Sequence, residues 1–506
     1  MRETRPASTL LELLWSAPGK DVAVVWAETG DRVTYGSLRE QVMSVAEALA
    51  GYGIGRGDRV AMALPNGLAT VVCFLAASVA GTAAPLNPGY RYEEFCFYLE
   101  DTAAKVLIVP PERAGEAGRA AADRGVLLLT AETSGGAVRV AAPRCASPSE
   151  PAPEDTALVL HTSGSTGRPK RVPLKHRHLA VSIRNVVSSY ELSSADVSLC
   201  LMPLFHVHGL VASTLATLLT GGTVVVPSRF NPLSFWRLVR DHRVTWYSAV
   251  PTIHQLIVAR LGGGSEKPAG AGAESLRFVR SCSAALSPEL MHKMEAALGV
   301  PVLEAYGMTE ASHQMASNPL PPATRKPGTV GCGTGVRIRI MEEEGHLPGA
   351  GQPGEVLIQG PNVIEGYENN PEANAQSFVE GWFRTGDQGI LDEDGYLRLT
   401  GRLKELINRG GEKIAPREID EVLLAHPAIA EALCFGVPHP TWGEEVAAAV
   451  VLGQPASESE ILAWCRDRLA DFKCPKKLYM VESIPRTATG KVQRLNVAAT
   501  LAEPRR

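Results

Sequence analysis

The chain has 506 residues, more than a single hydrophobic core usually serves, which predicts one large domain and at least one smaller one. Apolar residues make up 45% and charged residues 21% of the chain, as in ordinary globular proteins. The formal net charge of -4 lacks the basic surplus with which proteins bind nucleic acids, so no nucleic-acid partner is expected.

The start of the chain and its cysteines indicate the cellular compartment of the protein. The first apolar run is broken by Glu12 and is too short for a signal peptide or a membrane span, so no membrane partner is expected. The nine cysteines are scattered without a CxxC pair, which favours reduced thiols over disulfides or a zinc site. We therefore expect a cytoplasmic protein.

Short apolar runs alternate with longer helix-like stretches over the first four hundred or so residues. The runs are VAMAL (60–64), VLIVP (106–110), TVVVP (223–227) and TWYSAVP (245–251). This rhythm predicts an α/β fold with largely buried strands. Residues 112–155, rich in Ala, Gly, Ser and Pro, are interpreted as a variable surface excursion.

The pattern changes after about residue 402. It predicts an amphipathic helix over 417–426 and strands near 430–437 and 445–452. Ser457, with Glu460 three residues on, has the pattern of a helix N-terminus. We therefore expect a large domain over 1–401 and a compact α+β domain over 402–506.

A loop dense in hydrogen-bond donors follows the strand-like run ALVL. It reads His161-Thr162-Ser163-Gly164-Ser165-Thr166-Gly167-Arg168-Pro169-Lys170. Glycines let backbone N–H groups approach a phosphate, hydroxyls add donors, and Lys170 adds a positive charge. The spacing is not that of a Walker A loop. The segment is thus predicted to hold nucleotide phosphates.

The stretch TSGSTGRPK closely resembles the signature of the adenylate-forming superfamily, which includes acyl-CoA synthetases, luciferases and nonribosomal peptide adenylation domains. Further motifs in the family's order are YGMTE (306–310), GWFRTGD (381–387), GRLKE (401–405) and PRTATGK (485–491). The resemblance implies a large multi-subdomain N-terminal adenylation domain and a small mobile α+β C-terminal lid. It also implies that ATP activates a carboxylic acid as its acyl-AMP.

The resemblance assigns a role to each motif. It implies catalytic roles for Lys491, Thr166 and Glu310. Lys491 bridges the carboxylate and the α-phosphate, and Glu310 holds Mg²⁺. ATP or AMP is expected to contact Thr162, Ser163, Gly164, Ser165, Thr166, Gly167, Lys170, Ala284, Tyr306, Gly307, Thr309, Asp387 and Arg402. Of these, Tyr306 corresponds to the adenine-stacking residue and Asp387 to the ribose ligand, supported by Arg402.

Two features concern the second half-reaction. Lys404 matches the hinge about which the lid rotates, and Gly410 and Gly411 resemble the tight turn that lines a pantetheine tunnel. They favour coenzyme A as the acyl acceptor. Arg171 departs from the family, since many relatives have glycine there. Three alternatives remain open: transfer of the acyl group to a carrier protein or an amine, a different short or medium acid, and a non-catalytic nucleotide-binding protein.

The acyl pocket is expected to be small and polar. Ser283 replaces a glycine of the family's SGGAPL-like run, and His208 and His313 fall where aryl or fatty acid enzymes tend to be apolar. Together they form a donor set for a second carboxylate. Several blocks, among them RSCSAALSP and EAYGMTEASHQM, also resemble the oxalate-CoA ligase branch. We therefore expect oxalate or another short dicarboxylate as substrate, in a monomer or homodimer.

Overall fold

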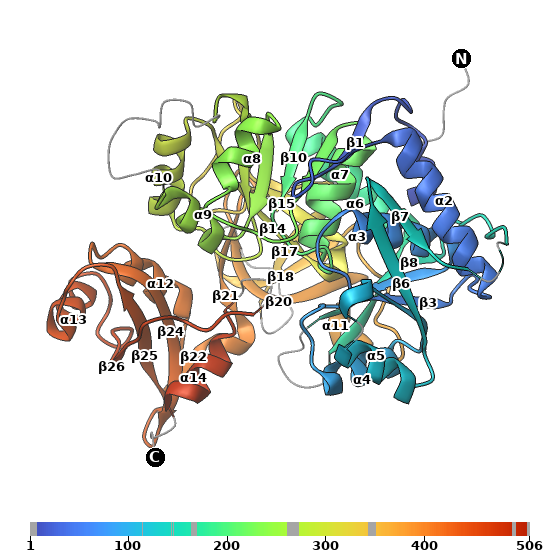
Figure 1. The fold of residues 1–506 in the computed structure, drawn as a ribbon. Coiled ribbons are helices and arrows are strands. Elements are labelled where there is room, and N and C mark those ends of the chain that lie inside the picture. The colour runs from blue at the N-terminus through green and yellow to red at the C-terminus, as the bar shows by residue number, and fades with distance from the viewer. Residues whose placement is uncertain are drawn as a thin grey trace.

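The computed structural model describes residues 8–113, 115–142, 144, 146–162, 169–260, 273–342, 351–487 and 492–502. It is a mixed α/β protein with a large N-terminal region and a smaller C-terminal lobe, which is the orange and red lobe in Figure 1. No helix in the described part of the chain is both long and apolar enough to cross a membrane.

Two sheets form most of the N-terminal region. The first has the order β16 (Cys332–Gly333), β15 (His313–Ser317), β14 (Val302–Met308), β13 (Phe278–Ser281), β12 (Trp246–Ala249), β10 (Val197–Cys200), β11 (Thr223–Val226), β1 (Val22–Trp26) and β2 (Arg32–Thr34). The second has the order β7 (Ala137–Val140), β6 (Leu127–Ser134), β5 (Ala104–Val109), β3 (Arg59–Met62), β4 (Thr82–Pro85), β8 (Thr156–Thr162) and β9 (Lys170–Lys175). The four apolar runs noted in the sequence thus supply buried strands.

Helices α2 (Tyr35–Gly51) and α3 (Leu68–Ala80) contact strands of both sheets, and α6 (His176–Tyr190) contacts β8, β9 and β15. Helix α3 is apolar all round and buried on nearly every side, as a helix between two layers must be. The other helices of this region are α1 (Leu10–Leu14), α4 (Tyr92–Asp101), α5 (Gly115–Asp123), α7 (Ala216–Leu219), α8 (Phe235–Asp241), α9 (Pro251–Val258), α10 (Pro288–Leu298) and α11 (Pro371–Ser377).

One expectation about this region is wrong. The segment 112–155 is not only a surface excursion, because it contains α5 and the paired strands β6 and β7. Ala117, Ala120 and Ala121 of α5 are buried in a core cluster with α4 and β5. Small side chains let the helix approach its neighbours closely, and the Ala-rich composition therefore reflects packing and not exposure.

A smaller sheet connects the two lobes. It is built from β17 (Arg337–Met341), β18 (Gly354–Gln359), β20 (Trp382–Leu391) and β19 (Phe378–Val379), with β21 (Leu397–Arg402) paired to β20. The chain then enters the C-terminal sheet, which contains β23 (Glu412–Ile414), β22 (Ile407–Arg409), β25 (Gly443–Leu452), β24 (Ile429–His439) and β26 (Lys477–Met480). The crossing lies just after the domain boundary expected at residue 401.

The C-terminal lobe matches the elements expected from its sequence. Helix α12 (Pro416–Leu424) buries Ile419 and Leu423 against the sheet, and α13 (Glu458–Arg466) begins with the capping box of Ser457 and Glu460. Helix α14 (Arg494–Ala502) covers the other face of the sheet through a separate core cluster. The lobe therefore has its own core and resembles an independent lid.

Candidate active site

The candidate site lies where strands of the first sheet end. Strands β10, β12, β13 and β14 run parallel, so their carboxyl ends share one edge of the sheet. Residues at or just beyond these ends include His208, Ser248, Ser283 and Tyr306. Ligands of open α/β sheets bind at such an edge. The topology thus brings together residues that the sequence separates by about a hundred positions.

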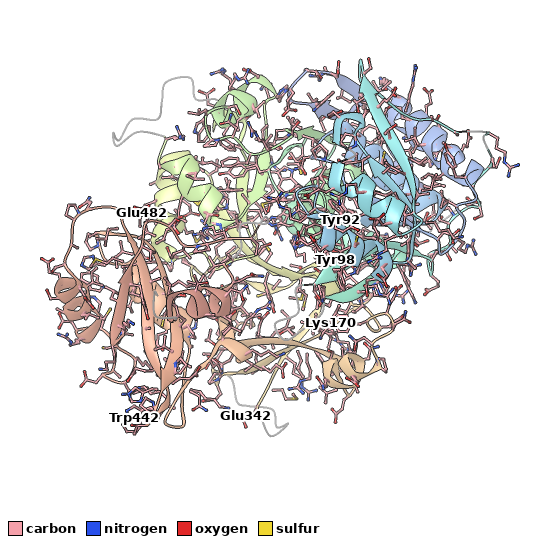
Figure 2. All side chains as sticks on the ribbon, turned by 60° about the horizontal axis from the view of Figure 1, so that its bottom comes forward. Tyr92, Tyr98, Lys170, Glu342, Trp442 and Glu482 are labelled. Carbon is pink, nitrogen blue, oxygen red and sulfur yellow. The ribbon has the colours of Figure 1, made fainter. Side chains whose placement is uncertain are left out.

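The loop predicted to bind phosphates lies between β8 and β9 in the sequence, and Thr162 and Lys170 are register partners in these strands. The Lys170 ammonium lies 4.5 Å from the centre of the Tyr367 ring, and burial lowers its pKa. The charge of Glu310 raises the pKa of Lys170, and the charge of Lys404 lowers it. Five further residues assigned to this loop lie outside the described residues: Ser163, Gly164, Ser165, Thr166 and Gly167. Figure 2 shows Lys170 on the side of the N-terminal region that faces the lid.

Glu310 is the carboxylate assigned to magnesium. It is 5% exposed, and burial raises its pKa despite a hydrogen bond that Tyr367 donates to Oε1 at 2.8 Å. Glu310 forms no ion pair with a cationic side chain among the described residues, and a buried carboxylate of this kind needs a positive partner to stay ionised. Magnesium held by one or two carboxylates and by phosphate oxygens meets that need. Glu310 therefore fits the assigned role, and Tyr367 is a functional candidate that the motifs did not indicate.

The three residues assigned to the nucleoside, Tyr306, Asp387 and Arg402, lie together. Asp387 on β20 is the register partner of Arg402 on β21, and their side chains form a 2.9 Å ion pair. The Tyr306 hydroxyl donates to the other oxygen of the Asp387 carboxylate. Burial raises the pKa of Tyr306, so this hydroxyl stays a donor. The three side chains form one cluster in which Asp387 is 6% exposed.

Gly307 and Thr309 fix the backbone next to Tyr306. A Cβ at Gly307 would lie 2.2 Å from the carbonyl oxygen of His313, so the hairpin of β14 and β15 closes only with glycine there. Thr309 is buried in the turn that carries Glu310. Ala284 lies exposed at the end of β13, immediately after Ser283. Each of these residues thus lies at the carboxyl edge of the first sheet.

The unusual Arg171 contacts α4. Its side chain donates to the backbone oxygen of Asp101 at 2.5 Å and lies 3.3 Å from that residue's carboxylate. It is also 3.9 Å from Glu368, which pairs with Arg59 at 2.6 Å. Successive residues of a strand face opposite sides, so Lys170 can serve the phosphates while Arg171 ties β9 to α4. The substitution therefore adds a structural contact behind the loop.

The three residues expected to contact the acid come together. His208 Nδ1 lies 3.0 Å from Ser283 Oγ, and the rings of His208 and His313 stack with centroids 5.3 Å apart. Ser283 and His313 have φ angles of 71° and 115°, a conformation that is strained for residues with side chains. Such strain is typical of functional sites, and here it aims both side chains at one cluster.

Two further members of this cluster were missed. Arg280 on β13 is fully buried and donates to Ser248 Oγ at 3.0 Å, while Ser248 Oγ lies 2.6 Å from His208 Nε2. A charged residue within the apolar strand Phe278–Ser281 was a signal in the sequence, because an arginine is almost never buried without a purpose. Ser248 gave no such signal.

The residues assigned to the lid are only partly placed. Lys404, the residue assigned to the hinge, lies in the turn Leu403–Glu405 between the two lobes, while Lys491 lies outside the described residues. Gly410 donates its backbone N–H to Trp442, and Figure 2 shows Trp442 at the far end of the lobe from Lys170. The Gly410-Gly411 turn is therefore not at the nucleotide site in this arrangement of the lobes.

A buried carboxyl of the N-terminal region, that of Glu304, lies close to an arginine of the lid. Glu304 on β14 is 2% exposed, burial raises its pKa to about 7, and Arg417 of the lid helix α12 lies 3.9 Å away. The pKa of Glu304 is higher in the folded protein than in the unfolded chain, so the folded state favours the protonated carboxyl. This contribution to stability is complete below the unfolded pKa and is lost as the pH rises through the folded pKa of about 7. Glu304→Gln should remove this loss, which amounts to about 3 kcal/mol.

The measurement is the thermal midpoint of the wild type and Glu304→Gln from roughly pH 5.5 to 8.5. We expect the wild type to lose stability relative to the variant up to about pH 7, where the Glu304 carboxyl ionises in the folded protein, and to lose no more at higher pH. Glu421→Gln is the matched control, because Glu421 pairs with the same Arg417 from an exposed position. Parallel midpoints for Glu304→Gln and the wild type would contradict the assignment.

Two family matches cover most of the chain. Residues 15–368 match the AMP-binding enzyme family, and residues 418–491 match the AMP-binding enzyme C-terminal domain. The chain is 48% identical to the probable CoA ligase CCL9 of Humulus lupulus, over 92% of this chain and 91% of the relative. It is 44% identical to the oxalate–CoA ligase of Arabidopsis thaliana, over 93% and 94%.

Solved structures support the same grouping. ATP-bound MatB from Rhodopseudomonas palustris superposes with a TM-score of 0.90 at 31% identity, covering 98% of this chain and 99% of that one. The apo form of the same protein gives 0.80 at the same coverage. The chain thus superposes better on the ATP-bound form than on the apo form of that protein.

Proposed function

Because the chain belongs to the AMP-binding enzyme family and is an acid-CoA ligase, we propose that its acid substrate is oxalate or another short dicarboxylate. The observation that carries this proposal is the polar cluster at the end of the first sheet. There, His208, Ser283 and His313 meet beside the buried Arg280. The 44% identity to an oxalate–CoA ligase supports it.

A polar pocket selects for a second carboxylate through desolvation. Burying an ionised carboxylate without donors is costly, whereas hydroxyl and imidazole donors offset that cost. A long alkyl or aryl tail gains nothing from such donors and would leave them without hydrogen bonds. The cluster thus favours a short acid with an anionic end over fatty or aromatic acids.

The reaction would proceed in two steps. The first carboxylate attacks the α-phosphate of ATP, forming the acyl-AMP and releasing pyrophosphate; the thiol of CoA then displaces AMP. In this proposal Lys170 and the loop before it hold the phosphates, Tyr306, Asp387 and Arg402 hold the nucleoside, and Glu310 would hold Mg²⁺. The metal would neutralise charge on the phosphate oxygens. Lys491 would approach with the lid during the first step.

The alternatives differ in the acid or the acceptor. A different short or medium acid would keep every nucleotide contact but need other pocket residues. Transfer to a carrier protein or an amine would keep only the first step, and a non-catalytic nucleotide-binding protein would release no pyrophosphate. The cytoplasmic location and the monomeric or dimeric state stay predictions.

A panel of acids tests the proposal directly. The purified protein is incubated with ATP, Mg²⁺ and CoA and with oxalate, malonate, acetate, propionate, a fatty acid or an aromatic acid. We expect acyl-CoA formation with the highest kcat/KM for a short dicarboxylate. A clear preference for a fatty or aromatic acid would reject the dicarboxylate while leaving the acid-CoA ligase in place.

Substitutions in the pocket should act on the dicarboxylate alone. Ser283→Ala and His313→Ala should each raise the KM for oxalate. The expected increase corresponds to about 1.5 to 3 kcal/mol of binding free energy, the usual cost of losing a hydrogen bond to a charged group. His208→Ala should have the same effect more weakly. The KM for ATP should barely change, and acetate and propionate should lose little, because their tails need no donor.

Ser281→Ala is the matched control for Ser283→Ala. Ser281 is also at the end of β13, but its hydroxyl is buried and makes no hydrogen bond among the described residues. Initial rates with oxalate, acetate and ATP give the three KM values for each variant. If Ser283→Ala and His313→Ala slow all acids alike, these residues do not select the distal carboxylate.

A further inference from the structure

Arg280 is a buried cation whose hydrogen-bond partners are neutral. Its Nε donates to the Tyr190 hydroxyl at 2.8 Å, its Nη1 to Ser248 Oγ at 3.0 Å and its Nη2 to Gln314 Oε1 at 3.1 Å. The side chain is wholly buried. Arginine stays charged in proteins, so its position must serve something that benefits from a fixed positive charge.

The hydrogen bonds of Ser248 have a direction, because a guanidinium can only donate. Ser248 Oγ accepts from Arg280, so its own proton is available for the second short contact, which is to His208 Nε2 at 2.6 Å. Arg280 Nη1 also lies 3.5 Å from that nitrogen. With two donors facing it, Nε2 is the acceptor of the imidazole, which places the ring proton on Nδ1.

The same direction continues to Ser283. Nδ1 of His208 lies 3.0 Å from Ser283 Oγ, so an Nδ1 proton is donated to that oxygen. The hydroxyl proton of Ser283 cannot then point at His208, and Ser283 Oγ has no other hydrogen-bond partner among the described residues. Ser283 is only partly buried, and its left-handed backbone holds it at the end of β13. Its proton is therefore presented to whatever enters the pocket.

The Nη2 group of Arg280 supports the strand that carries His313. Gln314 Oε1 accepts from both Arg280 and the Tyr190 hydroxyl, and Gln314 follows His313 directly on β15. The stack of His313 on His208 depends on the position of that strand. One buried guanidinium thus connects the strands that carry Ser248, Ser283 and His313.

We propose that Arg280 is a positioning residue for acid selection, which sets the hydrogen-bond direction Arg280 to Ser248 to His208 to Ser283 and so makes the Ser283 hydroxyl a donor to the distal carboxylate. This rests on the proposed dicarboxylate function. Arg280 acts through its neighbours without touching the substrate, since the Ser248 and His208 side chains lie between its guanidinium and Ser283. Its charge also favours an anion in the pocket.

The tautomer of His208 is the first test, and it needs no substrate. In the full-length protein with ¹⁵N-labelled histidine, the His208 signals are assigned by their loss in His208→Asn. We expect an Nδ1-protonated ring in the wild type and a changed pattern in Ser248→Ala and Arg280→Met. An Nε2-protonated or doubly protonated ring in the wild type, or the same ring state in all three proteins, would overturn the proposal.

Kinetics provide the second test. Arg280→Met and Ser248→Ala should raise the KM for oxalate by about tenfold or more, the loss expected for a charge-assisted hydrogen bond, with a smaller change in kcat and little change for acetate. Arg280→Lys keeps a cationic donor and should recover part of the loss. Equal losses for oxalate and acetate, or no recovery with lysine, would contradict the proposal.

Controls separate positioning from stability. Ser213→Ala removes another wholly buried hydroxyl, one without a hydrogen bond among the described residues, and should leave both KM values unchanged. If Arg280→Met does not fold, Ser248→Ala alone decides the matter, because it breaks the same relay and retains the arginine. Were the wild type to reject all short dicarboxylates, the proposed function would fail, whereas the tautomer result would still judge the relay.

Discussion

Lys491→Ala is expected to lower the rate of acyl-AMP formation by about 10²-fold or more and to spare thioester formation from supplied acyl-AMP. The expectation rests on the family resemblance of PRTATGK, since Lys491 itself lies outside the described residues. In the first step the substrate carboxylate must approach the negatively charged α-phosphate, and a lysine ammonium between them offsets their repulsion. The second step no longer brings these two charges together.

Arg494, which begins α14, holds this helix to the rest of the lid. Arg494, shortly after Lys491 in the sequence, pairs with Asp420 at 2.8 Å and with Glu405 at 3.1 Å, and it also donates to the backbone of Cys434. This anchors the start of α14 to α12 and β24. A rotation of the lid therefore carries the start of α14 with it.

The two half-reactions are measured separately. Acid-dependent pyrophosphate release reports the first step, and conversion of synthetic acyl-AMP and CoA to acyl-CoA reports the second. Lys473→Ala is the control, because Lys473 pairs with Glu418 on the surface of the same lobe. Equal losses in both steps would mean that Lys491 is not specific to adenylation, and the two-conformation interpretation would be wrong.

The sequence alone was sufficient for the layered fold, and its motifs indicated which residues should contact the nucleotide. Strands of the N-terminal sheets are continuous apolar runs, since both faces are covered, and α13 shows its start through Ser457 and Glu460. Tyr306, Asp387 and Arg402 were accessible because each belongs to a contiguous motif. Their meeting, in contrast, depends on the pairing of β20 with β21.

The polar cluster around His208 was only half predictable, for a physical reason. His208, Ser283 and His313 drew notice as polar residues at normally apolar positions. Ser248 and Tyr367, however, act through hydrogen bonds to residues 40 and 57 positions away, which no local pattern encodes. The Ala-rich segment of α5 was misinterpreted because small residues suit both loops and close packing, and only the tertiary fold decides between them.

Gly411→Leu is expected to abolish acyl-CoA formation while acid-dependent pyrophosphate release survives in a single turnover. Gly410 and Gly411 have φ angles of 61° and 97°, so their turn needs glycine. A Cβ at Gly410 would lie 2.8 Å from the Trp442 ring, but a Cβ at Gly411 meets nothing within 4 Å. The present arrangement of the lobes therefore has room for a side chain at Gly411.

The leucine of Gly411→Leu should obstruct CoA only after the lid has rotated for the second step. Figure 2 places Trp442, and with it this turn, far from Lys170, so we expect the turn to take no part in adenylation. The family resemblance brings the turn beside the incoming thiol after rotation, where a side chain would obstruct the narrow pantetheine arm. Even a small misplacement of reacting atoms costs about 10²-fold in rate, and a blocked tunnel should cost more.

Gly395→Leu separates this effect from backbone strain. Gly395 has a φ of 79° and also open space around its Cβ, but it lies in the turn between β20 and β21. It should bear a similar conformational penalty and retain both half-reactions. Unchanged thioester output in Gly411→Leu would remove this turn from the CoA tunnel, and the loss of pyrophosphate release as well would show that the turn also matters for adenylation. Only a loss confined to the second step agrees with a lid that presents different faces to the two reactions.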